Sequence, residues 1–308
     1  MAVGWFSGFF ARTTTCVIDL SLLHRASQSC NGSDELGGSS PRGPKYEMNL
    51  PLPKALAVRL AEGQPVIPNV MAASTPARFR GKLKIDPTRC PDGCAVCVEV
   101  CPTHAISASP LTIDLGSCVF CPLCVEACPE GAITYTNDYR MAATSRRGLR
   151  LGEVTDATPE ACSEEIHRLF GRSLKLRSVS AGGCSGCEHE LNALGNVNFD
   201  MGRFGIEFVA SPRHADGIVL SGTTTRNMEH ALAATYEAVP APKLVILFGA
   251  CAISAGIFQG SDQLARKYLE KLKIDLYIPG CPPHPLTFIY GLLTYLRKTH
   301  ATSEAGKA

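Results

Sequence analysis

The sequence of 308 residues contains little charge. Asp, Glu, Lys and Arg make up 19% of it, and 30 basic residues nearly balance 28 acidic ones. Nucleic-acid-binding chains usually carry a clear basic excess, so no nucleic-acid partner is expected. Large-scale disorder is also disfavoured, because disordered chains are poor in apolar residues, whereas hydrophobic residues reach 45% here.

Targeting and membrane-spanning signals are missing as well. The apolar start, residues 1–10, has no basic stretch before it and no small-residue cleavage site after it. The uncharged runs 244–261 and 278–296 reach transmembrane length, but Gly or Pro interrupts both, and each begins like a buried strand. We therefore expect a cytoplasmic chain without a membrane span.

The sequence also lacks a Gly-rich phosphate loop, a dinucleotide fingerprint and a nucleophile–base arrangement. We therefore expect no nucleotide, no flavin and no catalytic residue in this chain. What it has is cysteine, 15 residues in all. A chain of this length needs no disulfides to stabilise its core, and thiols without a secretion signal more often hold metal.

Eight cysteines form two copies of one motif. The first copy contains Cys90, Cys94, Cys97 and Cys101, and the second contains Cys118, Cys121, Cys124 and Cys128. A shift of 27 residues (121 − 94) superimposes the last three cysteines of each copy, and it also lays Ala105-Ile106 on Ala132-Ile133. The second copy reads C-x-x-C-x-x-C-x-x-x-C-P, the run that holds 4Fe–4S clusters in bacterial ferredoxins.

In two-cluster ferredoxins the fourth cysteine of each motif serves the neighbouring cluster. The predicted ligands of cluster 1 are Cys90, Cys94, Cys97 and Cys128. The predicted ligands of cluster 2 are Cys101, Cys118, Cys121 and Cys124. Zinc is the alternative, but zinc ribbons use cysteine pairs separated by a long gap. The first copy is one residue longer, and a turn at Asp92-Gly93 can absorb the insertion.

From residue 174 onward, short apolar runs alternate with helical patterns, which predicts a parallel sheet covered by helices. The expected strands are Leu174–Val179, Ile206–Val209, Gly217–Leu220, Leu244–Phe248 and Ile274–Ile278. The expected helices are Asn227–Val239, Asp262–Lys273 behind a Ser261 cap, and Pro285–Leu296. A short helix ended by Gly171 should bury one face, formed by Cys162, Ile166, Leu169 and Phe170.

Four further cysteines follow predicted strands of this sheet: Cys184 and Cys187, Cys251, and Cys281. Ligands of open α/β sheets gather at the carboxyl ends of the strands, so these thiols are candidates for one more cage. A helix beginning near Cys187 would aim free N–H groups at an anionic cluster. From the residues alone, four buried cysteines without a ligand role remain the alternative.

Ordered motifs around these cysteines resemble one family. They are Leu169-Phe-Gly-Arg-Ser, Gly183-Cys-Ser-Gly-Cys-Glu-His-Glu, Ser211-Pro-Arg-His-Ala-Asp, Gly249-Ala-Cys and Tyr277-Ile-Pro-Gly-Cys-Pro-Pro-His-Pro. The chain resembles the small subunit of membrane-associated, energy-converting nickel–iron hydrogenases of the formate hydrogenlyase type. That family also contains a cluster-bearing subunit of respiratory complex I. Residues 79–139 resemble the two-cluster ferredoxin subunit of such complexes, so the chain looks like a fusion of the two.

The resemblance implies a flavodoxin-like domain in which Cys184, Cys187, Cys251 and Cys281 bind a third, proximal 4Fe–4S cluster. It implies an electron-transfer role, with the active site in a hydrogenase-like large subunit. The other implied partners are antiporter-like membrane subunits and a ferredoxin or dehydrogenase as electron donor. The implied location is peripheral, on the inner face of the cell membrane.

The two-residue gap between Cys184 and Cys187 favours the hydrogenase branch, because the complex I subunits of the family carry adjacent cysteines. Two alternatives stay open: a complex-I-like quinone oxidoreductase subunit, and an iron–sulfur sensor or interaction protein. Glu188 and Glu190 are candidates for a proton path or for tuning charges, with interface salt bridges as the alternative. His214 and His284 are expected to fix loops through hydrogen bonds.

The predicted fold class is α/β and α+β, a two-cluster ferredoxin domain followed by a flavodoxin-like parallel-sheet domain. Residues 1–47 are expected to be a disordered tail, in which Cys16 and Cys30 are bystanders. Residues 48–78 are a linker or docking segment whose part 50–63 can form a helix with an apolar face. The remaining expected segments are the ferredoxin domain 79–140, a linker with a short helix 141–172, the hydrogenase small-subunit-like domain 173–300, and a tail 301–308.

Overall fold

The computed structural model describes residues 60–61, 63, 65–91, 93–153 and 159–297. Every described residue belongs to one compact unit, Val58–Ala308. The predictions for the tails 1–47 and 301–308 lie outside the described residues, as do Cys16 and Cys30. Of the helix predicted within 50–63, only residues 60–61 and 63 are described.

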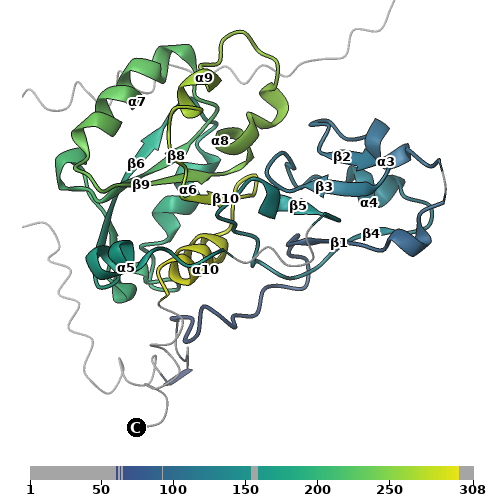
Figure 1. The fold of residues 1–308 in the computed structure, drawn as a ribbon. Coiled ribbons are helices and arrows are strands. Elements are labelled where there is room, and N and C mark those ends of the chain that lie inside the picture. The colour runs from purple at the N-terminus through teal and green to yellow at the C-terminus, as the bar shows by residue number, and fades with distance from the viewer. Residues whose placement is uncertain (1–59, 62, 64, 92, 154–158, 298–308) are drawn as a thin grey trace, which may run out of the picture. The chain divides into compact units, whose positions relative to one another are not determined.

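The C-terminal part is built on a five-stranded parallel sheet in the order β10-β9-β8-β6-β7 (Figure 1). Read from the β7 edge, with the strands of this sheet numbered along the chain from one to five, the order is 2-1-3-4-5, the flavodoxin-like doubly wound order. The predicted parallel sheet is therefore confirmed. The strands are β6 (Leu174–Ser180), β7 (Ile206–Phe208), β8 (Gly217–Ser221), β9 (Leu244–Phe248) and β10 (Leu276–Ile278).

Helices cover both faces of this sheet. One face packs α7 (Arg226–Ala238), α8 (Ala250–Ser254) and α9 (Arg266–Leu269), and the other packs α6 (Gly186–Ala193) and α10 (Pro285–Tyr295). Neighbours on one strand show this division, because successive side chains point to opposite faces. Val245 and Leu247 share a core with α7 and α8, whereas Ile246 and Phe248 share one with α10.

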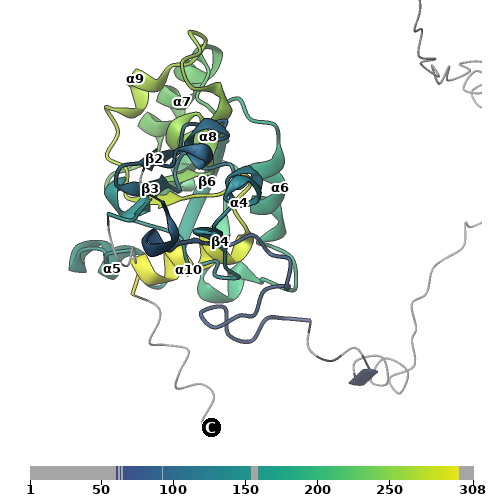
Figure 2. The same ribbon diagram turned by 90° about the vertical axis from the view of Figure 1, so that its right-hand side faces the viewer.

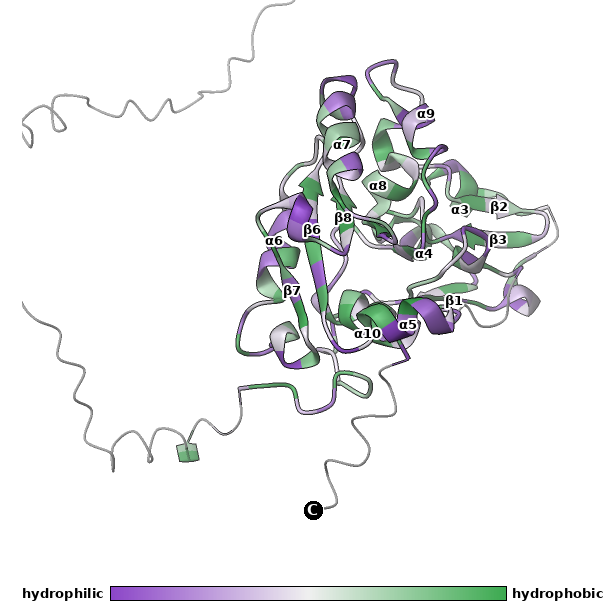
Figure 3. Cartoon of the chain, turned by 60° about the vertical axis from the view of Figure 1, so that its left-hand side comes forward, coloured by the Kyte–Doolittle hydropathy of each residue, from purple (hydrophilic) through white to green (hydrophobic). Residues whose placement is uncertain are grey.

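The helix α10 lies in the interior. Its residues are buried along nearly the whole length, and Figure 3 shows much of it in the green of hydrophobic residues. The ring of Phe288 lies edge to face with that of Phe248 on β9, with 5.7 Å between the ring centres. Helix α10 confirms the prediction of Pro285–Leu296, and α7 confirms that of Asn227–Val239 to within one residue at each end.

The helix expected over Asp262–Lys273 is wrong in length, since α9 covers only Arg266–Leu269. The Ser261 hydroxyl does accept the N–H of Gln263, as a cap would. However, the next residues pair with the segment before α7: Leu264 forms a bridge with Thr225, and Ala265 donates its N–H to the carbonyl of Thr224. This backbone pairing occupies Leu264 and Ala265, and the helix begins only at Arg266.

Helix α5 (Glu164–Phe170) precedes β6. Its cap, Ser163, accepts the N–H of Ile166 through the side chain, so the helix begins after Cys162 instead of including it. Cys162 is buried as predicted, but Leu169 is 48% exposed and does not belong to the buried face. Short 3₁₀ turns complete this part of the chain: η3 (Met201–Phe204), η4 (Pro212–His214) and η5 (Gly256–Phe258).

The ferredoxin-like part repeats one unit, as the sequence predicted. Antiparallel pairs join β1 (Leu83–Ile85) to β4 (Ile133–Tyr135) and β2 (Ile106–Ala108) to β3 (Leu111–Asp114). A shift of 27 residues takes the start of β2 to that of β4 (133 − 106) and the start of α3 (Val96–Glu99) to that of α4 (Leu123–Ala127) (123 − 96). Around them lie η1 (Pro87–Arg89), η2 (Arg147–Leu149) and β5 (Arg150–Leu151), which pairs with β3.

The ferredoxin-like part and the sheet share a continuous core within the second unit. Leu115 and Leu149 belong to the same buried cluster as Ile253 of α8 and Leu247 of β9. Backbone bonds in both directions also join Ala143 to Tyr277 on the edge strand β10. Figure 2 shows α4 and β4 in front of the sheet in this view. The segment predicted as a linker thus carries ordered contacts at Ala143.

Candidate metal centres

The first group of thiols gathers at the start of α3. Cys90 follows η1, Cys97 lies on α3, and both line one small cavity with Cys94 and Cys128. Burial raises the pKa of Cys97, and Cys90, Cys94 and Cys128 raise it further, which requires all four thiols to be neighbours. Of the predicted turn, Asp92 lies outside the described residues, and Gly93 has φ +76°, a backbone conformation that favours glycine.

The second group gathers at the start of α4. Burial raises the pKa of Cys118 to about 12, and the thiols of Cys124, Cys101 and Cys121 add to this shift. Burial also raises the pKa of Cys124 to about 11. At neutral pH these thiols therefore hold their protons, and a metal must displace them on binding. The structure brings together the same four cysteines that the motif rule assigns to cluster 2.

Backbone N–H groups point at three cysteine sulfur atoms of the first two thiol groups. Ala105 donates to Cys101 Sγ over 3.3 Å, and Ala132 donates to Cys128 Sγ over 3.2 Å. These two bonds are equivalent under the 27-residue shift (132 − 105), so the repeat extends to the hydrogen bonding. Phe120, at φ +55°, donates its N–H to Cys118 Sγ over 3.3 Å. Hydrogen bonds to sulfur stabilise thiolates and tune the potential of an iron–sulfur cluster.

The third group lies at the carboxyl ends of three strands. Cys184 follows β6 and Cys187 lies on α6, Cys251 lies on α8 directly after β9, and Cys281 follows β10. Burial raises the pKa of Cys187, with Glu188 and the thiols of Cys251, Cys281 and Cys184 adding to it. The sequence assigned these four cysteines to one edge of the sheet, and the structure places them together beside the point where the strand order reverses, between β6 and β8.

Glycines leave room for these sulfur atoms. Gly249 has φ +94°, and a Cβ built on it would lie 2.7 Å from Cys187 Sγ. Its N–H donates to the carbonyl of Ile278, and the N–H of Ala250 donates to that of Gly280, so the loops after β9 and β10 are tied together. The four thiols, the cradle without a side chain and the start of α6 match the donor set of a 4Fe–4S cluster.

No cluster of His, Cys, Asp and Glu side chains in the described ranges has three members placed to hold one metal ion between them. The thiol groups above are therefore defined by mutual electrostatic contact and by their shared surroundings. Each contains four thiols, the number of ligands that a cubane cluster takes, and their assignment as ligands stays a prediction.

The carboxylates after Cys187 differ in their surroundings. Glu188 accepts the hydroxyl of Ser221 over 2.6 Å. Burial works to raise its pKa, but hydrogen bonds from Ser180, Ser221 and its own backbone N–H, together with the charge of His189, lower it. Burial raises the pKa of Glu190, which forms no ion pair with any residue of the described segments. Their proposed role in proton transfer or tuning stays a prediction.

One of the histidine predictions is confirmed. His284 caps α10, its Nδ1 accepting the N–H of Leu286 over 3.2 Å, and its ring packs against Phe79 and Phe199. Burial lowers the pKa of His284, which favours the neutral, accepting form. For His214 the structure gives a backbone bond to Ser211, and the role of its side chain stays a prediction.

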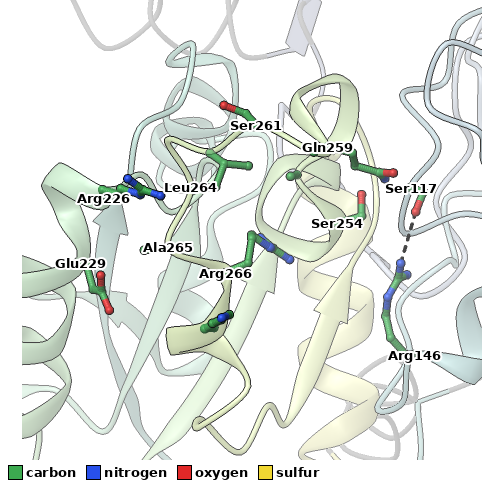
Figure 4. A pocket seen from close by; sticks show the side chains of 13 residues that line it. Ser117, Arg146, Arg226, Glu229, Ser254, Gln259, Ser261, Leu264, Ala265 and Arg266 are labelled. Atoms are coloured by element: carbon green, nitrogen blue, oxygen red, sulfur yellow. Dashed lines mark hydrogen bonds between the residues drawn. The ribbon is translucent and has the colours of Figure 1, made fainter.

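Two polar side chains beside these groups were missed by the sequence reasoning. Tyr135 donates its hydroxyl to the carbonyl of Cys121 over 2.6 Å, and Arg266 donates to three carbonyls of α8. Arg266 also lines an open cleft of about 900 Å³ with Arg146 and Arg226 (Figure 4). The 27-residue repeat gives no signal for Tyr135, because the equivalent position holds Ala108 (135 − 27). Arg266 lies outside that repeat.

Two family models match the chain. The model described as NADH ubiquinone oxidoreductase, 20 kDa subunit, matches residues 184–295 and so includes the third thiol group. The model of a 4Fe–4S binding domain matches residues 111–134, which contain the second cysteine motif.

Curated relatives agree with both models. The chain is 35% identical over 165 residues to formate hydrogenlyase subunit 7 of Escherichia coli, covering 50% of this chain and 62% of the relative. It is 45% identical over 111 residues to an NADH-quinone oxidoreductase subunit of Citrifermentans bemidjiense, covering 36% and 65%. It is 34% identical over 134 residues to a probable membrane-bound hydrogenase subunit of Pyrococcus furiosus, covering 44% and 80%. The match thus spans less than two thirds of the length of the first two relatives.

Proposed function

Since this chain belongs to the family of the 20 kDa subunit of NADH:ubiquinone oxidoreductase, we propose that it is the electron-transfer subunit of a membrane-associated, hydrogenase-like complex. It holds three 4Fe–4S clusters, two in the ferredoxin-like part and one at the carboxyl edge of the sheet. When bound, the clusters supply one-electron carriers with potentials that the protein sets. The active site lies in a partner, a hydrogenase-like large subunit.

The observation that carries this proposal is the grouping of twelve thiols into three sets of four. Cys128 joins the thiols of the first motif, and Cys101 joins those of the second. Such an exchange is the arrangement of two-cluster ferredoxins. The third set draws on three separate loops, which only the folded sheet brings together.

The contacts support an order of transfer. Gly256 lies between the second and third thiol groups: a Cβ built on it would be 3.7 Å from Cys251 Sγ and 3.7 Å from Val119, the neighbour of Cys118. Val119 and Phe120 also line a cavity of about 280 Å³ with Cys281. The second thiol group therefore adjoins the third. We assign the first group to the electron donor, a ferredoxin or a dehydrogenase.

The large subunit takes the opposite end of this path. Cys184 and Cys281 are exposed at the carboxyl edge of the sheet, so a partner must cover them to exclude water from a cluster bound there. Among the residues that the structure describes, no helix has the length and apolar character of a membrane span. We propose antiporter-like membrane subunits as the anchor, with this chain peripheral on the inner face of the cell membrane.

Metal analysis of the native complex tests this function. We expect nickel in the complex, about twelve iron per copy of this chain, and a stoichiometric large subunit. The second candidate function is a complex-I-like quinone oxidoreductase subunit, favoured by the 45% identity to the NADH-quinone oxidoreductase relative. Iron without nickel, together with quinone-dependent oxidation of the reduced clusters, would establish that candidate instead. A chain isolated without a large subunit would favour an iron–sulfur sensor.

A further inference from the structure

A half-buried arginine of α9, Arg266, binds the carbonyl groups at the end of helix α8. Arg266 Nη1 donates to the carbonyls of Cys251 and Ala252 over 3.3 and 2.8 Å, and Nη2 donates to that of Ile253 over 2.7 Å. The carbonyls at a helix C-terminus carry partial negative charge, so a guanidinium there is held by charge as well as by hydrogen bonds. One of these carbonyls belongs to a cysteine of the third thiol group. The charge is therefore fixed beside that group.

The positive charge of Arg266 has no direct counterpart. Among the described residues no carboxylate forms an ion pair with it. Burial lowers its pKa, as does the charge of Arg146 across the cleft, while Cys251 and Glu270 raise it. An arginine nonetheless stays charged at neutral pH.

The second thiol group is different in this respect. Its nearby arginine, Arg146, forms two parallel bonds to Asp114, over 2.8 and 2.7 Å, and also reaches the hydroxyl of Ser117 beside Cys118. Figure 4 shows Arg146 and Ser117 at one side of the cleft and Arg266 near its middle. The carboxylate of Asp114 neutralises the charge of Arg146, whereas the charge of Arg266 is not paired with a carboxylate of the described residues. The second and third thiol groups therefore lie in different electrostatic surroundings.

We propose that Arg266 is a positioning residue that raises the reduction potential of the cluster held by Cys251 above that of its neighbour. A fixed positive charge stabilises the more negative, reduced form of a cluster, and net charge is one of the quantities that set iron–sulfur potentials. Electrons in the ferredoxin-like part are then drawn toward the third group and the large subunit. This inference rests on the proposed function, since it requires the third cluster.

The test is a redox titration of the purified, cluster-loaded chain, followed by electron paramagnetic resonance. Arg266→Gln removes the charge and keeps a donor for the α8 carbonyls. We expect the ratio of reduced to oxidised third cluster at a fixed potential to fall about tenfold, which is about 59 mV for one electron. Arg266→Lys keeps the charge, so its ratio should stay within about threefold of the wild type, although it loses hydrogen bonds to α8.

Arg226→Gln is the matched control. It removes the same charge from the same cleft, but its guanidinium forms no ion pair or hydrogen bond to α8 within the described part. We expect its third cluster to titrate like that of the wild type. An unchanged potential in Arg266→Gln overturns the inference, as does an equal fall in Arg266→Lys or in Arg226→Gln.

If Arg266→Gln does not assemble the third cluster, Ser254→Asp takes its place. Ser254 lines the same cleft as Arg266, at the end of α8, so a carboxylate there offsets the positive charge of Arg266 beside the third thiol group. The expected result is the same fall in potential, and an unchanged potential overturns the inference. A wild-type chain with only two clusters refutes the proposed function itself, an outcome distinct from a third cluster that is present but does not shift.

Discussion

Replacing Gly249 by Ala should remove the third cluster and leave the other two in place. The new Cβ would lie 2.7 Å from Cys187 Sγ, whereas nonbonded heavy atoms prefer separations of about 3.5–4.0 Å. The sulfur must therefore move by about 1 Å, which exceeds the roughly 0.5 Å within which a ligand set has to be held. The residue also has φ +94°, where a side chain costs about 1–3 kcal/mol.

The assay is the iron content of the reconstituted Gly249→Ala chain with its electron paramagnetic resonance spectrum. We expect the loss of about four of about twelve iron atoms, with the signals of the ferredoxin-like part retained. Gly260→Ala is the matched control, because Gly260 has φ +81° but a Cβ there meets nothing within 4 Å. It places a side chain at a positive φ without touching a thiol. Equal iron contents and spectra in the two variants would refute the steric argument.

Two further predictions concern ligand exchange and pH. Cys128→Ala should lose the same cluster as Cys94→Ala and give the same residual spectrum, although Cys128 lies in the motif of Cys121; a spectrum matching Cys121→Ala would contradict the exchange. Burial raises the pKa of Asp275 from its ordinary 3.8, so the folded state binds that proton more tightly. Its stabilising contribution is complete below pH 3.8 and is lost as pH rises through the folded pKa. The free energy of unfolding in urea should therefore rise for Asp275→Asn relative to the wild type as the pH rises, by about 1.4 kcal/mol for each pH unit by which burial raises the pKa. A difference between the two proteins that does not change with pH would contradict this.

Much of the sheet could be predicted because its strands are continuous apolar runs. Strand β9 matches the predicted Leu244–Phe248 at both ends, since it is buried on both faces and the apolar run is the whole signal. The thiol groups could be predicted for a similar reason. Cysteine spacing fixes which thiols one loop can supply, and the strand ends fix which loops meet.

Long-range contacts left no such local signal. The helix over Asp262–Lys273 was predicted from periodicity, but pairing of Leu264 with Thr225 overrides it. Arg266 looked like any basic residue of an exposed helix, and only the approach of α8 reveals its bonds to Cys251 and its neighbours. Tyr135 likewise depends on a partner 14 residues away, on the other side of α4 in the chain.

The direct test of the whole account is the amount of iron and acid-labile sulfide in the full-length chain, purified and reconstituted without oxygen. Three cubane clusters require about twelve iron and about twelve sulfide per chain, with no stoichiometric zinc. A chain that saturates at about eight iron, or that holds zinc in place of iron at one of the thiol groups, would contradict it.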